Sequence, residues 1–451
     1  MPKVALHTLG CKLNFAESAT IARQFRAKGY DVVEPDDRAD VCVINTCSVT
    51  DRADRECRQI VRRALRHSPD AYVIVLGCYA QLRSGELAAI PGVDLVLGTK
   101  EKFEIFDHAG DFQKLSCAQA FVSPVADLDT FVGATSTGSY ERTRAFIKVQ
   151  DGCDYSCSFC TIPLARGTSR STAVREIVAQ AAEAANAGYL EVVLTGVNVG
   201  DYGRKSGSSL LDLLKQLVLV DGLKRIRISS VEPNLLTDEL LSFWGGNPKI
   251  CKHFHLPLQA GSEAILQSMR RRYPLKLYAD LVDRIRRLAP DAGIGADLIT
   301  GSPGETDELF AETYRFLTDL PISYLHVFTY SPRPNTLAAS LPGQIEPRIR
   351  FYRSEQLRIL SAKKKRAFHH RFLGSERDVL VENRTEAGEW TGLTGEYVRV
   401  NFRNDLELSN RIVNVRIHDL EGEHCTGHLI DTSSLPTQEL STTSGEVSLC
   451  A

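Results

Sequence analysis

Three cysteines lie close together in the segment DGCDYSCSFCTIP, where Cys153, Cys157 and Cys160 follow the spacing C-x3-C-x2-C. Four thiolates would complete a zinc site or an iron–sulfur cluster, but nothing nearby supplies a fourth ligand. Three thiolates on a four-iron cluster leave one iron with an open position for a substrate or cofactor. The alternatives are a zinc site completed by a distant Cys or His and a chance grouping.

A second, dispersed set of cysteines follows three strand-like segments near the start of the chain. Cys11, Cys47 and Cys78 come directly after VALHTLG, VCVINT and VIVLG, which are typical of buried parallel strands. Parallel strands place their carboxyl ends on one edge of a sheet, so these cysteines can converge in space. The pattern predicts a second three-thiolate cluster with one open iron, and chance is again the alternative.

The remaining cysteines have simpler interpretations. Cys42 fits a small core residue and Cys57 falls in a helical segment, whereas Cys117, Cys425 and Cys450 stand alone. Cys251, His253 and His255 alternate along one predicted strand and could share a face. A metal site there is conceivable, but we expect packing or substrate contact inside a barrel.

The elements that position the first triad are six strand-like runs at 145–150, 191–196, 225–230, 253–258, 294–299 and 324–330. Helical patterns such as TAVREIVAQAAEAANAG lie between them, with apolar residues at steps of three and four. Alternating strands and helices predict a parallel sheet closed into a partial (β/α)6 barrel, which carries its chemistry at the carboxyl ends of the strands. The triad and the motifs TGVN, SVEP, PLQAGS, TGSPGE and TYSPRPNT all occupy such ends.

Length and composition limit the number of domains and the class of protein. The chain has 451 residues, 43% hydrophobic and 24% charged, with a net charge of −2, which fits two or three globular domains without a global basic field. No apolar run approaches the ~18 residues that span a bilayer. The start, MPKVALHTLGCK, lacks a signal-peptide pattern, so we expect a cytoplasmic protein with no membrane partner and with cysteines used as ligands or catalytic thiols.

The last third of the chain combines a basic and an acidic part. A helix-like stretch between Leu341 and Phe372 has nine Lys/Arg and two Asp/Glu, and Arg270, Arg271 and Arg272 could extend the same surface. This stretch is either a solvated helix face or a surface that contacts RNA phosphates. Short strand-like runs follow at 377–383, 396–402, 411–420 and 425–430, with twelve Asp/Glu and six Lys/Arg between Leu373 and Asp431.

The first triad at the end of the first barrel strand resembles the radical S-adenosylmethionine (radical SAM) superfamily. The resemblance implies that the open iron binds SAM, which one electron cleaves to methionine and a 5′-deoxyadenosyl radical. It also implies which residues contact SAM. Thr195, Gly196 and Asn198 would hold the amino group, Ser230 and Glu232 would face the ribose, and Gln259 and Asp297 would complete the site, Asp297 within the segment against the adenine.

The two triads together resemble the methylthiotransferases, a radical SAM family with an auxiliary cluster. The matching stretches include TLGCKLN, INTCSVTDRADRECRQIVRRA, LGCYAQ, DGCDYSCSFCTIPLARGTSRS, HLPLQAGS and TGSPGETDELF. The expected fold is α/β. An amino-terminal open parallel domain spans 1–115, the radical SAM barrel 139–367 and a small β-barrel resembling the TRAM domain 370–433. We expect the Ser/Thr-rich end, 434–451, to be disordered.

Within this family, TLGCKLN, NTCSVTDRADR and LHVFTYSPRPNT look most like the branch that acts on threonylcarbamoyladenosine at position 37 of tRNA. The implied reaction uses two 4Fe–4S clusters and two SAM molecules. One SAM methylates sulfur held at the auxiliary cluster, and the other gives the radical that removes hydrogen from carbon 2 of adenine. The implied partners are tRNA and an electron donor such as flavodoxin or ferredoxin, and the sulfur donor is unknown. The alternatives are isopentenyladenosine in tRNA, a ribosomal protein, and an electron carrier or redox sensor with two clusters.

Overall fold

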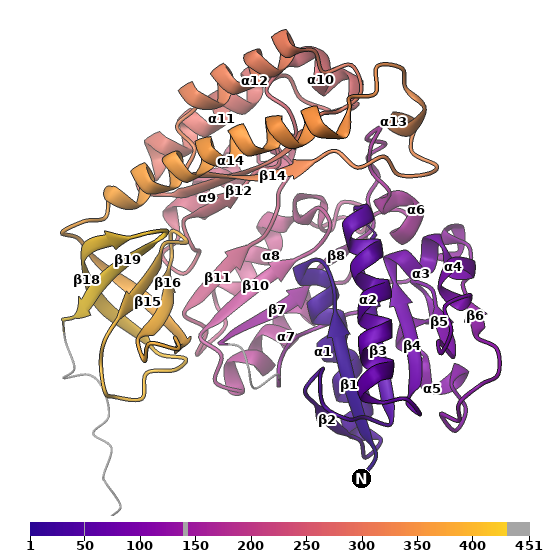
Figure 1. The fold of residues 1–451 in the computed structure, drawn as a ribbon. Helices are drawn as coiled ribbons and strands as arrows, with labels where there is room; N and C mark the ends of the chain where they lie inside the picture. Colours follow the sequence, from indigo (N-terminus) through magenta and orange to yellow (C-terminus); the bar gives the residue numbers. More distant parts are fainter. Residues whose placement is uncertain (49, 139–142, 431–451) are drawn as a thin grey trace, which may run out of the picture.

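The structure, a computed structural model, describes residues 1–48, 50–138 and 143–430 and is α/β in class. The chain forms three units in sequence order, an amino-terminal sheet, a central barrel and a small carboxyl-terminal β-barrel (Figure 1). The end segment that the sequence predicts to be disordered lies outside the described residues.

The amino-terminal unit is one parallel sheet. Its strand order is β2 (Asp31–Val33), β1 (Lys3–Thr8), β3 (Val41–Thr46), β4 (Tyr72–Gly77), β5 (Leu95–Leu97) and β6 (Gln119–Phe121). Helices α1 (Lys12–Ala27) and α5 (Ile105–His108) pack on one face, and α2 (Asp51–His67) and α4 (Ser84–Ala88) pack on the other. The strands β1, β3 and β4 are those that the sequence predicts. The three-residue strands β2, β5 and β6 are too short to show a pattern.

The central unit confirms the partial barrel. Its strands run in the order β7 (Arg144–Lys148), β10 (Glu191–Thr195), β11 (Arg225–Ile228), β12 (His253–His255), β13 (Gly293–Thr300) and β14 (Tyr324–Thr329). Single parallel bridges, Ile226 to Ile250 and Ser230 to His255, join the two three-stranded halves. The helices outside them are α7 (Val174–Asn186), α8 (Leu210–Leu217), α9 (Asp238–Gly246), α10 (Glu263–Ser268), α11 (Leu275–Leu288) and α12 (Asp307–Asp319).

The first predicted barrel strand, 145–150, is divided in the structure. After β7, residues Gln150–Asp151 form β8, which pairs with β9 (Arg170–Ser171) rather than with the barrel. The short helix α6 (Ile162–Arg166) lies between β8 and β9. The segment from Cys153 to Cys160 is therefore closed at its base by this small antiparallel pair.

A long helix, α14 (Pro347–His370), leads from the barrel to the last unit. Pro347 is favourable at its first turn because the amide hydrogen that proline lacks has no helical partner there. The last unit is a closed barrel in the order β15 (Glu376–Arg384), β16 (Trp390–Thr394), β17 (Arg399–Phe402), β19 (His424–Leu429) and β18 (Ile412–Glu421). The sequence does not predict β16. Its Gly392 resembles a turn residue, but here a Cβ would lie 2.4 Å from the Leu380 carbonyl oxygen of β15.

Across the described ranges, none of the helices combines the length and apolar character needed to cross a bilayer.

Candidate active site between two cysteine triads

The sheet of the amino-terminal unit brings the dispersed triad together at one edge. Cys11 is the N-cap residue of α1, Cys47 directly follows β3, and Cys78 begins α3 (Cys78–Leu82) after β4. The strands β1, β3 and β4 are neighbours, so their carboxyl ends meet. Cys78 is buried, Cys47 is half-buried and Cys11 is exposed, which leaves this edge open on one side.

Two glycines allow the turns that present these cysteines. Gly10 and Gly77 precede Cys11 and Cys78 in two LGC segments and have φ values of 96° and 100°. A Cβ at Gly10 would lie 2.7 Å from the Cys47 Cβ atom, and one at Gly77 would lie 2.7 Å from the Thr46 carbonyl oxygen. A side chain at either position would therefore be strained and would push the neighbouring loop away.

The barrel triad lies in the loop between β8 and α6. The backbone N–H of Tyr155 donates to Cys153 Sγ and that of Ile162 donates to Cys160 Sγ, each at 3.4 Å. The Arg271 Nη1 atom donates to Cys157 Sγ at 3.1 Å. Each sulfur of this triad thus accepts a hydrogen bond, which suits thiolates that bind metal.

The spacing of the sulfur atoms distinguishes between the metal sites considered from sequence. Among the described residues, neither triad gathers its three Sγ atoms within 4.8 Å of one another. A single tetrahedral zinc ion, with Zn–S bonds of about 2.3 Å, would hold its thiolates about 3.8 Å apart. A four-iron cube binds each thiolate at a separate corner and needs a wider spacing. Neither triad is therefore arranged around a single tetrahedral zinc ion.

In the metal-free chain, burial raises the thiol pKa values of the barrel triad. The pKa of Cys160 rises to about 12 and that of Cys153 to about 11, and burial also raises the pKa of Cys157 against the opposing charge of Arg271. These groups therefore become thiolates when iron binds, with release of protons.

Arg271 contacts the barrel triad, whereas the sequence alone suggested a place on a basic surface. From the sequence, Arg270, Arg271 and Arg272 could extend the basic surface of the later helix, but the Arg271 side chain is 3% exposed and forms an ion pair with Glu232. It reaches Cys157 because the turn after α10 points it inward. Glu232, predicted to face the ribose of SAM, is thus held against the barrel triad.

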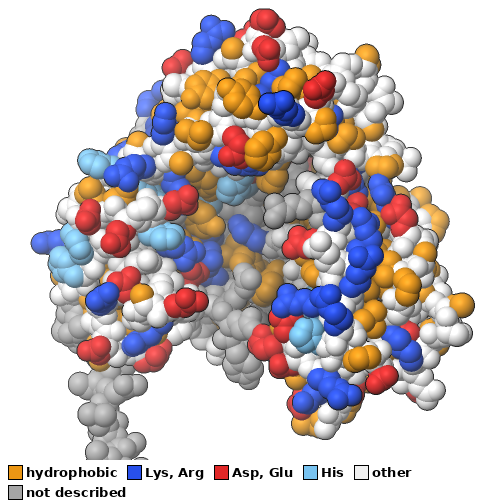
Figure 2. Space-filling model, viewed as in Figure 1, with side chains coloured by type: hydrophobic (Ala, Val, Ile, Leu, Met, Phe, Trp, Pro, Cys, Tyr) orange, Lys and Arg blue, Asp and Glu red, His pale blue; other side chains and the backbone are white. Residues whose placement is uncertain are grey.

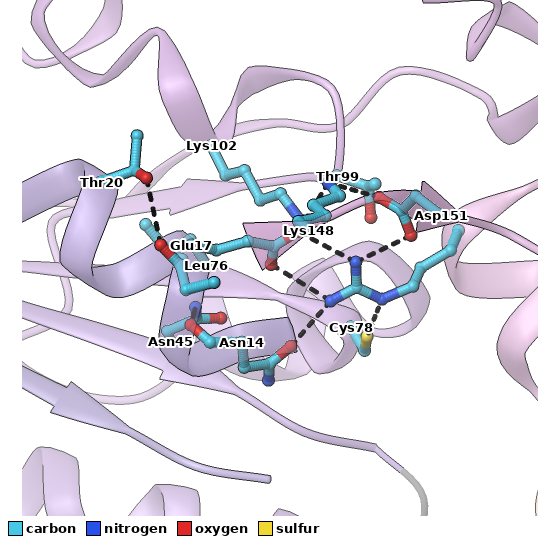
Figure 3. Close-up of polar contacts among 12 residues, drawn as sticks. Asn14, Glu17, Thr20, Asn45, Leu76, Cys78, Thr99, Lys102, Lys148 and Asp151 are labelled. Atoms are coloured by element: carbon cyan, nitrogen blue, oxygen red, sulfur yellow. Dashed lines mark hydrogen bonds and ion pairs between the residues drawn. The ribbon is translucent and has the colours of Figure 1, made fainter. Parts of the chain in front are cut away.

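Arg166 links the helix that follows the barrel triad to the dispersed triad. It lies six residues after Cys160 on α6, and its Nε atom donates to Cys78 Sγ of the other triad at 3.2 Å. The side chain is 2% exposed, and Glu17 and Asp151 pair with the same guanidinium. Figure 3 labels Cys78 beside the charged residues of the same group. No pattern in the sequence marks this residue, because the contact links segments 88 residues apart.

The predicted strand-two motif lies close to β8. A Cβ at Gly196 would lie 2.9 Å from the Gln150 carbonyl oxygen, and the Asn198 N–H donates to Gln150 Oε1 at 2.8 Å. The Asn198 Oδ1 atom is buried without a hydrogen-bond partner among the described residues, whereas Thr195 is buried at the end of β10. An unpaired acceptor in this position fits a ligand that donates, such as the amino group of SAM.

Ser230, His255 and Asp297 form a hydrogen-bonded chain across the strand ends. Ser230 Oγ lies 2.8 Å from His255 Nδ1, and His255 Nε2 lies 2.8 Å from Asp297 Oδ1. His326 approaches the same carboxylate oxygen at 3.3 Å. Burial alone would raise the pKa of Asp297, but the charge and hydrogen bond of His255, together with His326, hold it well below its usual range.

Asp297 and His326 each line a cavity. One, of about 240 Å³, is lined by Gln259, Asp297 and Cys160 with aromatic and hydroxyl side chains around them. The other, of about 510 Å³, lies between β14, α14 and the carboxyl-terminal barrel and is lined by His326 and Lys365 among others. Gln259 is held in the left-handed region, with φ 75°, by backbone hydrogen bonds to β13. Sequence reasoning missed His326, whose alternation with Tyr324 along β14 was the available signal.

The metal site considered at Cys251, His253 and His255 does not form. His253 Nε2 lies 2.6 Å from the Tyr324 hydroxyl and its ring stacks on Tyr397, whereas Cys251 faces Glu191 at 3.9 Å. These contacts are packing at the base of the barrel, as we expected.

Two helices carry exposed cations. On α14, Lys364 donates to the carbonyl oxygens of Thr318 and Leu320 and Lys365 pairs with Glu423, whereas Lys363 and Arg366 have no partner in the described part of the chain. On α2, the exposed arginines Arg55, Arg62 and Arg66 are spaced seven and four residues apart, which places them on one face of the helix. Figure 2 shows Lys and Arg side chains along the position of α2, beside the hollow that faces the carboxyl-terminal barrel.

Three family models match the chain in succession. They are the uncharacterized protein family UPF0004 over residues 3–98, the radical SAM superfamily over 147–317 and the TRAM domain over 370–430.

Similar proteins of known activity cover nearly the whole chain. The threonylcarbamoyladenosine tRNA methylthiotransferase MtaB of Bacillus subtilis is 37% identical over 92% of this chain and 94% of its own length. That of Aquifex aeolicus is 41% identical over 85% and 94%. The tRNA-2-methylthio-N(6)-dimethylallyladenosine synthase of Geobacter metallireducens is 34% identical over 91% and 95%.

Among solved structures, the radical SAM methyltransferase TsrM of Kitasatospora setae, with cobalamin and a [4Fe–4S] cluster bound, superposes with a TM-score of 0.55. The superposition covers 75% of this chain and 77% of that one at 15% identity, so it supports the fold alone.

Proposed function

Because the chain belongs to the radical SAM tRNA methylthiotransferases, we propose that it transfers a methylthio group to carbon 2 of N6-threonylcarbamoyladenosine at position 37 of tRNA. The observation that carries the assignment is the pair of three-cysteine sets, with Arg166, six residues after Cys160, donating to Cys78 Sγ of the other set. A similar enzyme that acts on dimethylallyladenosine is 34% identical, against 37% and 41% for the two threonylcarbamoyladenosine enzymes.

The two triads take different roles in this proposal. Cys153, Cys157 and Cys160 hold the 4Fe–4S cluster that binds SAM, and Cys11, Cys47 and Cys78 hold the auxiliary 4Fe–4S cluster that presents sulfur. When bound, the barrel cluster supplies the electron that cleaves SAM to methionine and a 5′-deoxyadenosyl radical. An adenine C–H bond has no acidic proton that a side chain could remove, so acid–base groups alone would not serve.

The chain's own residues bind and orient the reactants. We assign the amino group of SAM to Asn198, whose Oδ1 atom is an unpaired acceptor, with Thr195 and Gly196 shaping the same turn. We assign Gln259 and Asp297 to the cavity beside Cys160, where Asp297 stays ionised and can accept hydrogen bonds from a ligand.

Ser230 and Glu232 act less directly in this proposal. Ser230 fixes the His255 ring, and Glu232 neutralises Arg271 beside Cys157. We therefore expect both to position groups that contact SAM.

The tRNA backbone is assigned to the arginine face of α2 and to the free cations of α14. Cations bind phosphates independently of the base sequence. Because α2 starts four residues after Cys47, RNA bound along this face would extend toward the auxiliary triad. The acidic carboxyl-terminal barrel then makes local contacts only, for example at the 510 Å³ cavity with its aromatic and basic lining.

The proposal also covers the domain limits, partners and location. We take 1–115, 139–367 and 370–433 as the main parts of the three domains, with the first continuing to Phe121 because β6 pairs with β5. The reductant is a low-potential donor such as flavodoxin or ferredoxin. We propose that the enzyme works in the cytoplasm, where its tRNA substrate lies.

One experiment tests the substrate assignment. Reconstituted, reduced enzyme is offered SAM with three substrates, namely tRNA carrying threonylcarbamoyladenosine, tRNA carrying isopentenyladenosine, and the ribosomal protein substrate of the sister branch. Mass spectrometry of the digested products should detect methylthiolation on the first alone. Turnover only on the second or third would overturn the branch and leave the radical chemistry standing. Release of no 5′-deoxyadenosine in any reaction would instead favour an electron carrier or sensor.

A further inference from the structure

Five charged side chains are buried together where the amino-terminal unit meets the barrel (Figure 3). Glu17 from α1 pairs with Lys102 at 2.7 Å, with Lys148 at 3.0 Å and with Arg166 at 3.0 Å. Asp151 pairs with Lys148 at 2.7 Å and with Arg166 at 3.0 Å. None of the five is more than 2% exposed.

These charges do not cancel. Three cations face two carboxylates, and each carboxylate is in ion-pair contact with at least two of the cations. Arg170, at 3.9 Å from Asp151, adds a further cation at the edge of the group. An uncompensated buried charge is strongly unfavourable, and burial accordingly lowers the pKa of Lys102 to about 8. An anion close to the group would stabilise its cations.

The nearest candidate is the dispersed triad. The one guanidinium nitrogen of Arg166 that faces away from both carboxylates, Nε, donates to Cys78 Sγ at 3.2 Å. A 4Fe–4S cluster bound by three thiolates would carry a net negative charge, and Cys78 would be one of its ligands. The excess positive charge of the buried group is therefore placed against a ligand of the auxiliary cluster.

Arg166 also helps to hold the loops of the triad. Its Nη2 atom donates to Asn14 Oδ1 at 2.7 Å, and the Asn14 Nδ2 atom donates to the carbonyl oxygens of Leu9 at 2.8 Å and Thr46 at 3.0 Å. Leu9 and Thr46 lie two residues and one residue before Cys11 and Cys47, respectively. One arginine thus connects to all three loops, directly at Cys78 and through Asn14 at the other two.

The barrel triad has a comparable arginine in a different electrostatic setting. Arg271 donates to Cys157 Sγ at 3.1 Å, but its guanidinium is paired with Glu232, so the two charges cancel. The contact at the barrel triad thus comes from a one-to-one ion pair, whereas the contact at the dispersed triad comes from a group of three cations and two carboxylates.

We propose that Arg166 is a positioning residue that holds the loops of Cys11, Cys47 and Cys78 and supplies the positive charge that offsets the auxiliary cluster. The inference rests on the proposed function, in that these cysteines are taken to bind a cluster. A positive charge and an N–H···S bond both favour the more negative, reduced form of an iron–sulfur cluster, so Arg166 should raise its reduction potential.

The test measures each cluster separately in the full chain. Changing Cys153, Cys157 and Cys160 to Ala leaves the auxiliary site, and changing Cys11, Cys47 and Cys78 to Ala leaves the barrel site. Arg166→Gln and Arg166→Lys are introduced into both backgrounds, with Arg271→Lys as the matched change at the other triad. Each reconstituted protein is assayed for iron and titrated with dithionite under electron paramagnetic resonance.

At the potential where the parent auxiliary cluster is half reduced, Arg166→Gln should lower the reduced-to-oxidised ratio about tenfold, equivalent to about 59 mV for one electron. Arg166→Lys keeps the positive charge and loses the Nε–H group, so it should change the reduced-to-oxidised ratio less than Arg166→Gln does. Arg271→Lys should leave the auxiliary cluster unchanged, and neither Arg166 variant should move the barrel cluster.

The remaining outcomes are decisive as well. Loss of iron from the auxiliary site alone in both Arg166 variants, with circular dichroism unchanged, would support the holding role. Full iron with an unchanged midpoint potential in Arg166→Gln would overturn the inference. A parent auxiliary chain without iron would instead contradict the proposed function.

Discussion

His326 and Asp297 approach each other at 3.3 Å, yet they line different cavities. Asp297 belongs to the cavity beside Cys160, and His326 belongs to the one that opens toward the carboxyl-terminal barrel. The pair therefore lies at the boundary between the two cavities, with one residue lining each.

The first prediction concerns this boundary. His326→Gln should lower methylthiolation of tRNA about tenfold, the effect of losing one interaction of about 1.4 kcal/mol in the transition state. Cleavage of SAM without tRNA should persist, because the barrel triad is untouched. Product and 5′-deoxyadenosine are quantified together, with His418→Gln on the outer barrel as control. An equal loss of both products would place His326 in the SAM site instead.

The number of clusters gives the second prediction. Anaerobically reconstituted protein should bind about eight irons, four per cluster, and replacement of Cys153, Cys157 and Cys160 by Ala should leave about four. Iron and acid-labile sulfide are measured by colorimetric assay. A plateau near four irons in the unmodified protein would contradict the two-cluster assignment.

The third prediction separates the roles of the triads. Cys157→Ala removes a barrel ligand and should abolish 5′-deoxyadenosine. Cys47→Ala should retain SAM cleavage but make no methylthiolated nucleoside, because the auxiliary site loses a ligand. Liquid chromatography with mass spectrometry detects both products. Normal methylthiolation by Cys47→Ala would show that the dispersed triad is not the sulfur site.

Salt dependence tests the RNA surfaces. Changing Arg55, Arg62 and Arg66 together to Ala should reduce the slope of log affinity against log salt by about one for each phosphate that the variant no longer binds. Changing Lys363 and Arg366 should act similarly. The structure narrows the α14 test to these two residues, because Lys364 and Lys365 already bind groups within the fold.

Both variants are compared with Lys276→Ala, an exposed cation on α11 outside these faces. Binding is measured by filter retention over a range of salt concentrations. If the slope of a variant equals that of the parent protein, the corresponding helix face does not contact phosphates and is only exposed to solvent.

The fifth prediction is a loss of stability in acid. Burial, and then the nearby Lys365, lower the pKa of His369 to about 4, below the ~6.5 expected in the unfolded chain. Between these two pH values the unfolded state binds more protons than the folded state does. The stabilising contribution is therefore fully present above pH ~6.5 and is lost as pH falls toward 4, by up to about 3 kcal/mol.

His369→Gln should weaken this pH dependence of the thermal midpoint, measured by differential scanning calorimetry between pH 7.5 and 5. His370→Gln, at the exposed neighbouring position, is the matched control. A pH dependence identical to that of the parent would exclude His369 as its source.

Sequence reasoning succeeds where local patterns carry the information. Buried runs followed by Cys11, Cys47 and Cys78 are visible along the chain, and so is the spacing of the barrel triad. Arg166 and Arg271 escape such reasoning because each acts across a distance of more than 80 residues. A charged side chain is usually expected at the surface. The positions of Arg166 on α6 and of Arg271 after α10, which direct the two side chains inward, are visible only in the folded structure.

The buried charges around Glu17 also limit how the molecule can be divided. Glu17 and Lys102 come from the amino-terminal unit, and Lys148, Asp151 and Arg166 from the barrel. A chain cut between the two units would leave each fragment with ionised groups deprived of their partners, so neither should be soluble alone. A chimaera of this chain with a relative should fold only when these five residues all come from the same parent.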